Sequence, residues 1–263
     1  MGEGAFGEVF FLPPPEEGAR NVVLKIVPVN NGHVTCLVNG QPQMKLMDML
    51  AEIIISTELS KLSSSHHQTN AAPGFLTVRS CYLTEGRYPN KLLEKWDDYR
   101  AEKGSDNERP DIFPAKQNFI VLELENGGED LENVTLNNAS QGWAIFQQVA
   151  HALAVAEQSL QFEHRDLHWG NVLIDQQCPE KTLTYQSENQ DAWTVETHGV
   201  RATIIDFSLS RLTLPDDCDI FNNLSEDPDL FASDGDYQFD IYRYVLGNIF
   251  YLGTRPPFTF HLG

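Results

Sequence analysis

The segment His164–Asn171 constrains this chain more than any other part of its sequence. It reads HRDLHWGN and is followed by the short apolar run Val172–Ile174. A carboxylate at Asp166 can accept or orient the proton of a hydroxyl group, and the carboxamide of Asn171 can hold a metal ion. The segment therefore predicts a loop that carries a general base and a metal ligand side by side.

A second carboxylate, Asp206, ends the apolar run Ala202–Asp206. Mg²⁺ prefers oxygen ligands and keeps waters and phosphate oxygens as the rest of its shell. We therefore predict that Asp206 and Asn171 are the protein ligands of a magnesium ion.

Glycines recur at the start of the chain as Gly2-x-Gly4-x-x-Gly7-x-Val9. Alone, this pattern is weak, because it also opens dinucleotide-binding domains, where a helix follows it. Here it continues into Glu8–Leu12, which is typical of a strand. A glycine-rich turn between strands lets backbone N–H groups approach phosphate oxygens. An ordinary hairpin turn is the alternative.

Two opposite charges lie in apolar surroundings. Lys25 lies in the predicted strand 21–29, and Glu52 lies in the predicted helix 44–62. Such charges are costly unless they are paired, so we predict that they pair with each other. Lys25 could also be a residue that protects a sheet edge, but the pairing favours a phosphate-binding lysine.

In this order, the glycines, Lys25, Glu52, Asp166, Asn171 and Asp206 resemble the signature set of protein kinases. The resemblance implies a two-lobed α+β fold, with a small β-rich N-lobe around one main helix and a larger, mostly helical C-lobe. We expect the N-lobe at residues 1–124, a hinge at 125–130 and the C-lobe at 131–263. ATP and Mg²⁺ are the implied cofactors.

The hydrophobic pattern agrees with this division. Further strands are predicted at 75–83 and 117–125, and a short helix at 91–100. From residue 140 the sequence predicts a long helix with one buried stripe, formed by Ile145, Val149, Leu153, Ala156 and Leu160.

Longer stretches resemble the haspin family of kinases specifically. They are residues 52–56, 154–157, 162–173 and 234–243. This resemblance implies a nuclear, chromosome-associated enzyme that phosphorylates a threonine near the N-terminus of the histone three tail in mitosis. It agrees with Asp206-Phe207-Ser208 in place of Asp-Phe-Gly and with the lack of an Ala-Pro-Glu motif, so we expect no switch by activation-loop phosphorylation.

The family pattern also implies roles for single residues. The backbone of Glu125 and Gly127 would face the adenine, and Asp130 would bind the ribose. Leu124 would be the gatekeeper, although it could be an ordinary core leucine. Asp240 would brace the catalytic loop, although it could be only a carboxylate at a helix N-terminus.

Charge points to the substrate. The net charge is −20, which disfavours direct nucleic-acid binding and favours a basic peptide partner. Ten acids and one base lie between Asp206 and Asp240. A solvated acidic face is the alternative to a binding groove. By resemblance, the substrate-binding residues are Asp227, Asp229, Asp236 and His168.

Other features limit the remaining possibilities. The four cysteines are far apart, so neither a disulfide framework nor a zinc site is indicated, and no apolar stretch is long enough for a membrane span. We expect a monomer in the nucleus, or else the cytoplasm, and a chain that lacks the opening half-strand and the final C-lobe helices.

Two other functions remain open. His168 stands where most protein kinases have a lysine, as in small-molecule kinases of the aminoglycoside and choline type. An inactive module that binds histone tails is the other alternative.

Overall fold

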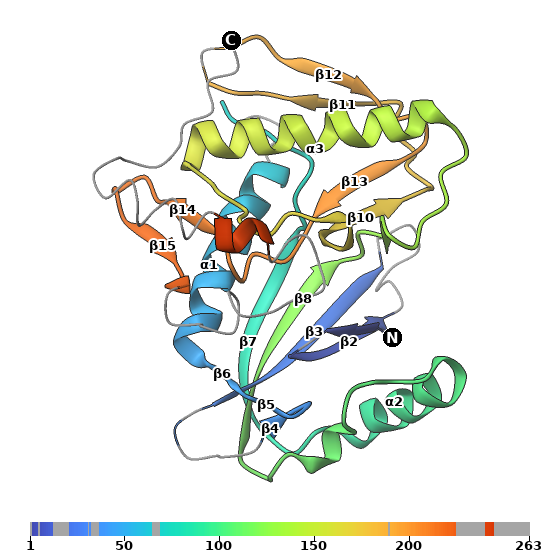
Figure 1. Cartoon of the computed structure of the whole chain (residues 1–263), viewed down its shortest axis with the longest axis vertical. Helices are drawn as coiled ribbons and strands as arrows, with labels where there is room; N and C mark the ends of the chain where they lie inside the picture. Colours follow the sequence, from blue (N-terminus) through green and yellow to red (C-terminus); the bar gives the residue numbers. More distant parts are fainter. Residues whose placement is uncertain are drawn as a thin grey trace. The chain divides into compact units, whose positions relative to one another are not determined.

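The computed structural model describes residues 2–4, 6–12, 21–30, 32, 37–64, 69–188, 190–224 and 240–244. The chain divides into two compact units, Met1–Asn222 and Asn223–Gly263. In the second unit, the described residues include one short helix, 240–244. The elements labelled in Figure 1 belong to the first unit.

The N-terminal part of the first unit is built on a six-stranded sheet. Its order is β1-β2-β3-β8-β7, all antiparallel, and β6 pairs in parallel with β3. A separate hairpin joins β4 and β5. The bounds are β1 Gly2–Gly4, β2 Gly7–Leu12, β3 Val22–Asn30, β4 Leu37–Val38, β5 Gln41–Pro42, β6 Met44–Lys45, β7 Val78–Gly86 and β8 Gln117–Glu125.

Two helices, α1 (Leu46–Ser64) and α2 (Asn90–Lys103), pack on opposite faces of this sheet. Side chains alternate along a strand, so Val23, Lys25 and Val27 of β3 share one face. On that face, the valines form a cluster with Met49 of α1. The alternation therefore turns Lys25 toward α1.

The C-terminal part of the first unit combines one long helix with short strands (Figure 1). β10 lies between β9 and β13, and two further hairpins join β11 to β12 and β14 to β15. A 3-10 turn, η1 Pro110–Ile112, precedes β8, and another, η2, precedes β10. The bounds are β9 Glu129–Asp130, α3 Ala139–Leu160, η2 Trp169–Asn171, β10 Val172–Asp175, β11 Thr182–Tyr185, β12 Trp193–Glu196, β13 Arg201–Ile204, β14 Arg211–Thr213 and β15 Asp219–Phe221.

Helix α3 begins and ends where local chemistry dictates. The Asn138 side chain accepts a hydrogen bond from the Gln141 backbone N–H at 3.0 Å, which caps the first turn. Gln161 adopts a left-handed conformation, φ 49°, just after the last turn. Both ends therefore use standard capping devices.

The largest core cluster joins the helices α1 and α3 and the strand β13. It contains Ile55 and Leu59 of α1, Ala152 and Val155 of α3, and Ile204 of β13. Residues from both sides of the predicted hinge thus bury one another.

The mixed α+β class predicted from the sequence is confirmed. The buried face of α3 is displaced from the predicted stripe: Val149 and Leu153 are only half-buried, whereas Gln148, Ala152 and Val155 are buried. Gln148, a polar residue that we did not predict to be buried, has no exposed surface. Its side chain hydrogen-bonds the Val200 carbonyl and the Ala202 N–H, at 3.0 and 2.8 Å.

The predicted lobe boundary at residues 125–130 stays a prediction. Among the described residues, no helix is both long and apolar enough to span a bilayer.

Candidate active site

The predicted glycine motif forms the hairpin of β1 and β2, in which Gly2 faces Val9 and Gly4 faces Gly7. A Cβ on Gly7 would lie 2.3 Å from the Ile26 carbonyl oxygen, so close packing against β3 already requires glycine there. A Cβ on Gly2 would meet only the Val9 Cβ, at 3.8 Å. Among the described residues, packing therefore places no steric demand on Gly2, and its predicted role beside a phosphate stays a prediction.

An amide from outside the sheet holds this hairpin. Asn107 Nδ2 donates to the Gly4 carbonyl at 3.3 Å and to Glu8 Oε1 at 3.0 Å. Asn107 Oδ1 in turn accepts from Asn39 Nδ2 at 2.8 Å. Glu8 is buried, so its carboxylate depends on such a polar partner.

The predicted pair of Lys25 and Glu52 is present. Lys25 Nζ lies 2.8 Å from Glu52 Oε1, and the two side chains are 28% and 6% exposed. Burial disfavours the charged lysine, but the carboxylates of Glu52 and Asp206 outweigh it and raise the pKa of Lys25 above its usual value. Lys25 therefore stays a cation across the physiological pH range.

Asp206 directly follows the residue after β13 and has a left-handed backbone, φ 62°. Its Oδ1 accepts from the Ser208 hydroxyl at 2.8 Å and from the Ser208 N–H at 3.3 Å. Burial disfavours the charged carboxylate, but Lys25 and the Ser208 hydrogen bonds hold the pKa of Asp206 below its usual value. The group is an anion at neutral pH.

Backbone contacts bring Asn171 and Asp206 together. The Ile205 N–H, one residue before Asp206, donates to the Asn171 carbonyl at 3.0 Å. Asn171 Nδ2 donates to the Asp166 carbonyl at 3.0 Å. This contact fixes the orientation of the carboxamide and leaves Asn171 Oδ1 on the other side of the group.

His164, which the sequence analysis quoted only as part of a motif, locks the same loop. Its Nδ1 accepts from the Asp166 N–H at 3.3 Å, and its Nε2 lies 3.0 Å from the Ile205 carbonyl. The proton of the neutral ring therefore belongs on Nε2. Burial lowers the pKa of His164, although the nearby carbonyl and carboxylates oppose the effect.

Arg165 is also held by a residue that the sequence analysis did not single out. Its Nε donates to Glu163 Oε2 at 2.9 Å, and Glu163 Oε1 lies 3.6 Å from Arg211 Nη1. Arg165 has a left-handed backbone, φ 67°. Arg165 is thus paired with a carboxylate of the same chain, that of Glu163.

The donor set fits Mg²⁺. An aspartate and a carboxamide oxygen are hard oxygen ligands, and magnesium usually takes one or two such groups from a protein. In the described part of the chain, no group of three or more His, Cys, Asp or Glu side chains is placed to hold a metal. Two protein ligands would leave the other positions around the ion to phosphate and water oxygens.

Residues 126–128 connect β8 to β9 and lie within the predicted hinge, 125–130. A Cβ on Gly127 would lie 2.8 Å from Leu173 Cδ1, and Gly128 has φ 101°. Leu124 lies in the core cluster beside α1. The Asp130 carboxylate accepts hydrogen bonds from Asn133, the shortest at 2.9 Å. The roles predicted for Glu125, Gly127, Asp130 and Leu124 in nucleotide binding stay predictions.

The structure gives His168 a local contact. Its Nδ1 accepts from the Gly170 N–H at 3.1 Å, which caps η2. The ring is exposed, as is the neighbouring Trp169, at 64%. Its substrate role stays a prediction.

The remaining predicted residues lie elsewhere. Asp227, Asp229 and Asp236 fall outside the described residues. Asp240 lies in the short helix of the second unit, where its Oδ1 is 2.7 Å from Arg243 Nη2. The bracing role of Asp240 stays a prediction.

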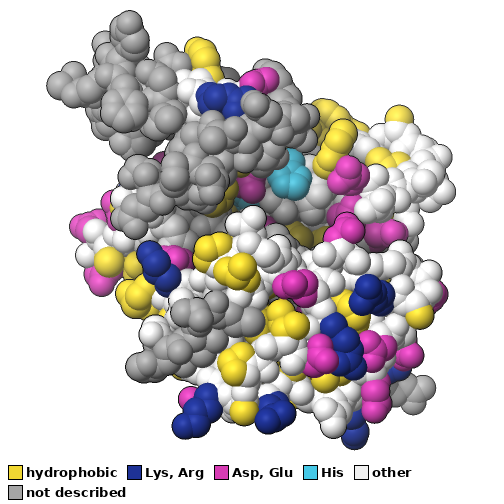
Figure 2. All heavy atoms as spheres, turned by 60° about the horizontal axis from the view of Figure 1, so that its bottom comes forward, with side chains coloured by type: hydrophobic (Ala, Val, Ile, Leu, Met, Phe, Trp, Pro, Cys, Tyr) yellow, Lys and Arg dark blue, Asp and Glu magenta, His cyan; other side chains and the backbone are white. Residues whose placement is uncertain are grey.

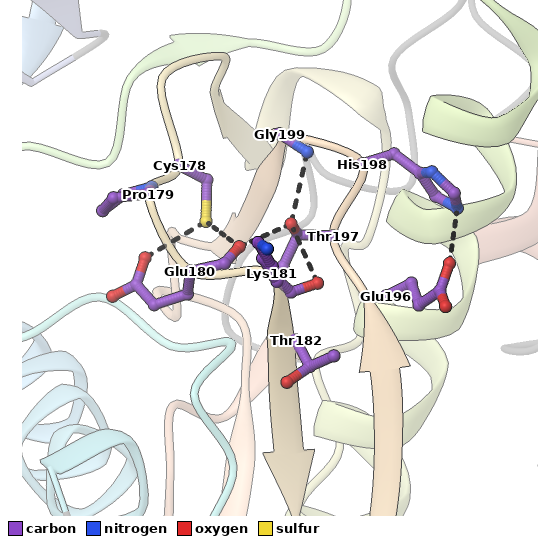
Figure 3. A pocket seen from close by; sticks show the side chains of 9 residues that line it. All are labelled: Cys178, Pro179, Glu180, Lys181, Thr182, Glu196, Thr197, His198 and Gly199. Atoms are coloured by element: carbon purple, nitrogen blue, oxygen red, sulfur yellow. Dashed lines mark hydrogen bonds and ion pairs between the residues drawn. The ribbon is translucent and has the colours of Figure 1, made fainter.

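Figure 3 shows a pocket of about 490 Å³ that none of these groups lines. Its walls come from residues 178–182 and 196–199. The Cys178 thiol points to Glu180 Oε2 at 3.2 Å, and burial together with this contact raises its pKa to about 11. The thiol is therefore protonated and unreactive at neutral pH.

Comparison with known proteins agrees with this geometry. The model of the haspin-like kinase domain matches residues 1–250. The haspin homologue of Drosophila melanogaster is 42% identical over 92% of this chain, and mouse haspin is 44% identical over 92%. The Arabidopsis thaliana homologue is 36% identical over 92%.

The chain spans 42%, 31% and 39% of the lengths of these three relatives, respectively. The matched part nevertheless includes every residue of the predicted phosphate and metal site. On this match, the chain belongs to the haspin-like kinase family.

Proposed function

We propose that this chain is a serine/threonine protein kinase that transfers the γ-phosphoryl group of ATP. The observation that carries the proposal is the Lys25–Glu52 pair at 2.8 Å, with Asp206 close enough to help raise the lysine pKa. A cation between two carboxylates at the edge of a glycine hairpin suits the phosphates of a nucleotide. Membership of a kinase family supports the same function.

Each group has a distinct part in the proposed reaction. Asp166 accepts or orients the proton of the attacking hydroxyl, and Lys25 holds the phosphates. Asn171 Oδ1 and Asp206 would hold Mg²⁺, which would neutralise charge on the phosphates when bound. Glu52 keeps Lys25 extended toward the site.

For the nucleotide itself, we propose the glycine hairpin as the cover and residues 125–130 as the adenine and ribose side. Val9, on β2, is half-buried and packs beside the cluster under α1. We therefore propose Val9 as an apolar contact for the base. The backbone of Glu125 and Gly127 and the carboxylate of Asp130 complete this side.

The proposed substrate is a threonine near the N-terminus of the histone three tail, phosphorylated in mitosis. A net charge of −20 favours a basic peptide. On the face shown in Figure 2, Lys and Arg side chains lie among Asp and Glu rather than in a continuous basic patch. We propose Asp227, Asp229, Asp236 and His168 as the residues that bind the tail.

One assay separates the possible activities. Purified protein is incubated with radioactive ATP and Mg²⁺, and with a histone-tail peptide, a scrambled peptide of equal charge, or choline. We expect incorporation into the tail peptide alone. Transfer to choline would indicate a small-molecule kinase. Tail binding without any transfer would indicate an inactive binding module.

The acidic residues are tested through the Michaelis constant. Neutralising Asp227, Asp229 or Asp236 singly should remove a pair between a carboxylate and a basic residue of the peptide. The loss of roughly 1–3 kcal/mol in peptide binding should raise KM for the tail peptide and leave KM for ATP unchanged. Replacing the peptide's Arg or Lys should have the same effect, less than additively with the protein change. An unchanged KM for the peptide in all three variants would show that these acidic residues form a solvated surface and do not bind the tail.

We further propose that the protein acts on chromosomes in the nucleus. The support is the substrate proposed above, which is a chromosomal protein. Imaging of the tagged protein through the cell cycle tests this, and exclusion from mitotic chromosomes would contradict it.

A further inference from the structure

We propose that Asn222 is a positioning residue that joins the helix carrying Glu52 to the turn carrying Asp206. The inference rests on the kinase function proposed above. Asn222 directly follows β15, which lies beside α1 (Figure 1). Its Nδ2 donates to the Asp48 carbonyl at 3.1 Å and to the Ser208 carbonyl at 3.0 Å.

The first contact fixes the part of α1 that matters for the site. Asp48 lies in the first turn of α1, four residues before Glu52. In an α-helix, the carbonyl of residue i is bonded to the N–H of residue i+4. The Asp48 carbonyl, which accepts from Asn222, is therefore also the helical acceptor for the Glu52 backbone N–H.

The second contact fixes the turn that carries the predicted metal ligand. The Ser208 hydroxyl and N–H both donate to Asp206 Oδ1. Asn222 holds the one remaining backbone group of Ser208, its carbonyl. A shift of Asn222 would therefore move the residue that orients Asp206.

Lys25 closes a ring of contacts. It pairs with Glu52 at 2.8 Å and interacts electrostatically with Asp206. The ring runs from Asn222 to α1, from Glu52 to Lys25, and back through Asp206 and Ser208. A primary amide has two N–H donors, and here each has a carbonyl acceptor on a different side of the ring.

This arrangement gives the chain a way to keep the Lys25–Glu52 pair assembled without an added phosphate group. Asn222 directly follows the β14–β15 hairpin. In kinases that are activated by phosphorylation, new pairs between arginine and the phosphate order the activation loop instead. If the role of Asn222 were confined to the β14–β15 hairpin, replacing it would leave α1 and the Asp206 turn unaffected.

The test compares three variants. Asn222→Asp keeps the shape but replaces both donors with an acceptor beside two carbonyls, and Asn222→Gln keeps the amide. Thr213→Val is the matched control, because it removes the hydrogen bond from Thr213 Oγ1 to Asp219 Oδ1, at 2.7 Å, within the same hairpin. The three proteins are compared with wild type by backbone hydrogen exchange, thermal unfolding and steady-state kinetics.

We expect Asn222→Asp to speed exchange in both residues 48–56 and residues 205–209 by about tenfold, the scale of one or two lost hydrogen bonds. Its kcat/KM should fall by a similar factor. Thr213→Val should speed exchange only in 211–221, and Asn222→Gln should lie between Asn222→Asp and wild type. If Asn222→Asp does not fold, Asn222→Gln against Thr213→Val decides in the same way.

Exchange confined to 211–221 in both Asn222 variants would overturn the proposal. The exchange experiment does not need catalysis, so it is separate from the proposed function. A wild type without kinase activity but with coupled exchange in 48–56 and 205–209 would refute the function and leave the bridge standing.

Discussion

The loop 164–171 and the glycine hairpin of β1 and β2 are held in place by different means. In the loop, backbone carbonyls and N–H groups of the 204–206 region hold His164 and Asn171 at 3.0 Å. The hairpin is instead held by one neighbouring strand and by Asn107, which comes from the segment after α2. The groups proposed for chemistry are thus fixed by nearby main chain, whereas the proposed nucleotide cover depends on a side chain from a distant segment.

This difference predicts how variants divide. Changes in the loop should affect the rate of the chemical step, because the positions of its groups are already set before substrate binds. Changes in the hairpin should affect nucleotide binding and stability first.

The largest effect is expected for Asp166→Asn. The amide cannot accept the hydroxyl proton, so kcat should fall at least ~10²-fold, the usual scale of general-base assistance. The dissociation constant for ATP, measured by calorimetry with Mg²⁺, should stay close to that of wild type. Full turnover in this variant would show that the loop is wrongly assigned.

Glu52→Gln should have the next largest effect. It removes the charge partner of Lys25, whose side chain is only partly exposed, so we expect a loss of roughly 1–3 kcal/mol in transition-state stabilisation, or about 10–100-fold in kcat/KM. Glu58→Gln is the control, since it removes an exposed pair with Lys61 on the same helix. Equal losses in both variants would mean that the buried pair has no special part.

A matched pair of glycine substitutions sharpens the comparison within the hairpin. Gly7→Ala places a methyl 2.3 Å from the Ile26 carbonyl oxygen, so it should destabilise the fold by about 1–3 kcal/mol. Gly2→Ala should leave the unfolding free energy nearly unchanged but raise KM for ATP. Urea denaturation and ATP kinetics measure the two effects. A stable Gly7→Ala would contradict the close packing of β2 on β3.

Asn107→Ala should act mainly on the same hairpin. It leaves the buried Glu8 carboxylate without the Asn107 amide, which should cost about 1–2 kcal/mol. KM for ATP should rise a few-fold while kcat changes little. Asn138→Ala, which removes the side-chain cap of α3 away from the proposed nucleotide site, is the control and should leave KM for ATP unchanged. A fall in kcat with unchanged KM would contradict the division between hairpin and loop.

The smallest effect expected is a pH dependence of stability from His164. Its pKa is lower in the folded protein, so below about pH 6.5 the unfolded state binds the proton first. The unfolding free energy should therefore fall as pH drops through this range. Urea denaturation between pH 5 and 7.5 should show a shallower fall in His164→Asn than in wild type.

His151 is the necessary comparison, because burial lowers its pKa as well. It stacks on Trp193 of β12, with the ring centroids 5.3 Å apart. His151→Gln should remove its own share of the pH dependence without changing kcat. An unchanged slope in both variants would show that neither ring controls the acid response.

The sequence predicted what local pattern and charge can encode. The strand around Lys25 alternates, and the helix around Glu52 lies next along the chain, so their pairing followed from the cost of burying two lone charges. Helix α1 was expected at residues 44–62 and runs from Leu46 to Ser64. Such predictions need only near neighbours or complementary charges.

Neutral amides left no comparable signal. Asn107, Gln148 and Asn222 each bond backbone groups far away in sequence, and nothing in their local patterns marks them. The close packing of Gly7 on β3 also had no local signal, because it depends on which strand the fold brings alongside. These contacts depend on which main-chain groups the fold leaves facing one another.

The core that α1 shares with α3 determines how the first unit should unfold. Ile55, Leu59 and Phe75, on one side of residues 125–130, are buried against Ala152 and Val155 on the other. A fragment cut at residue 124 would expose these side chains to water and should aggregate rather than fold. Residues 125–130 therefore do not separate two independently folding domains. The parts before and after them should unfold together in a single transition.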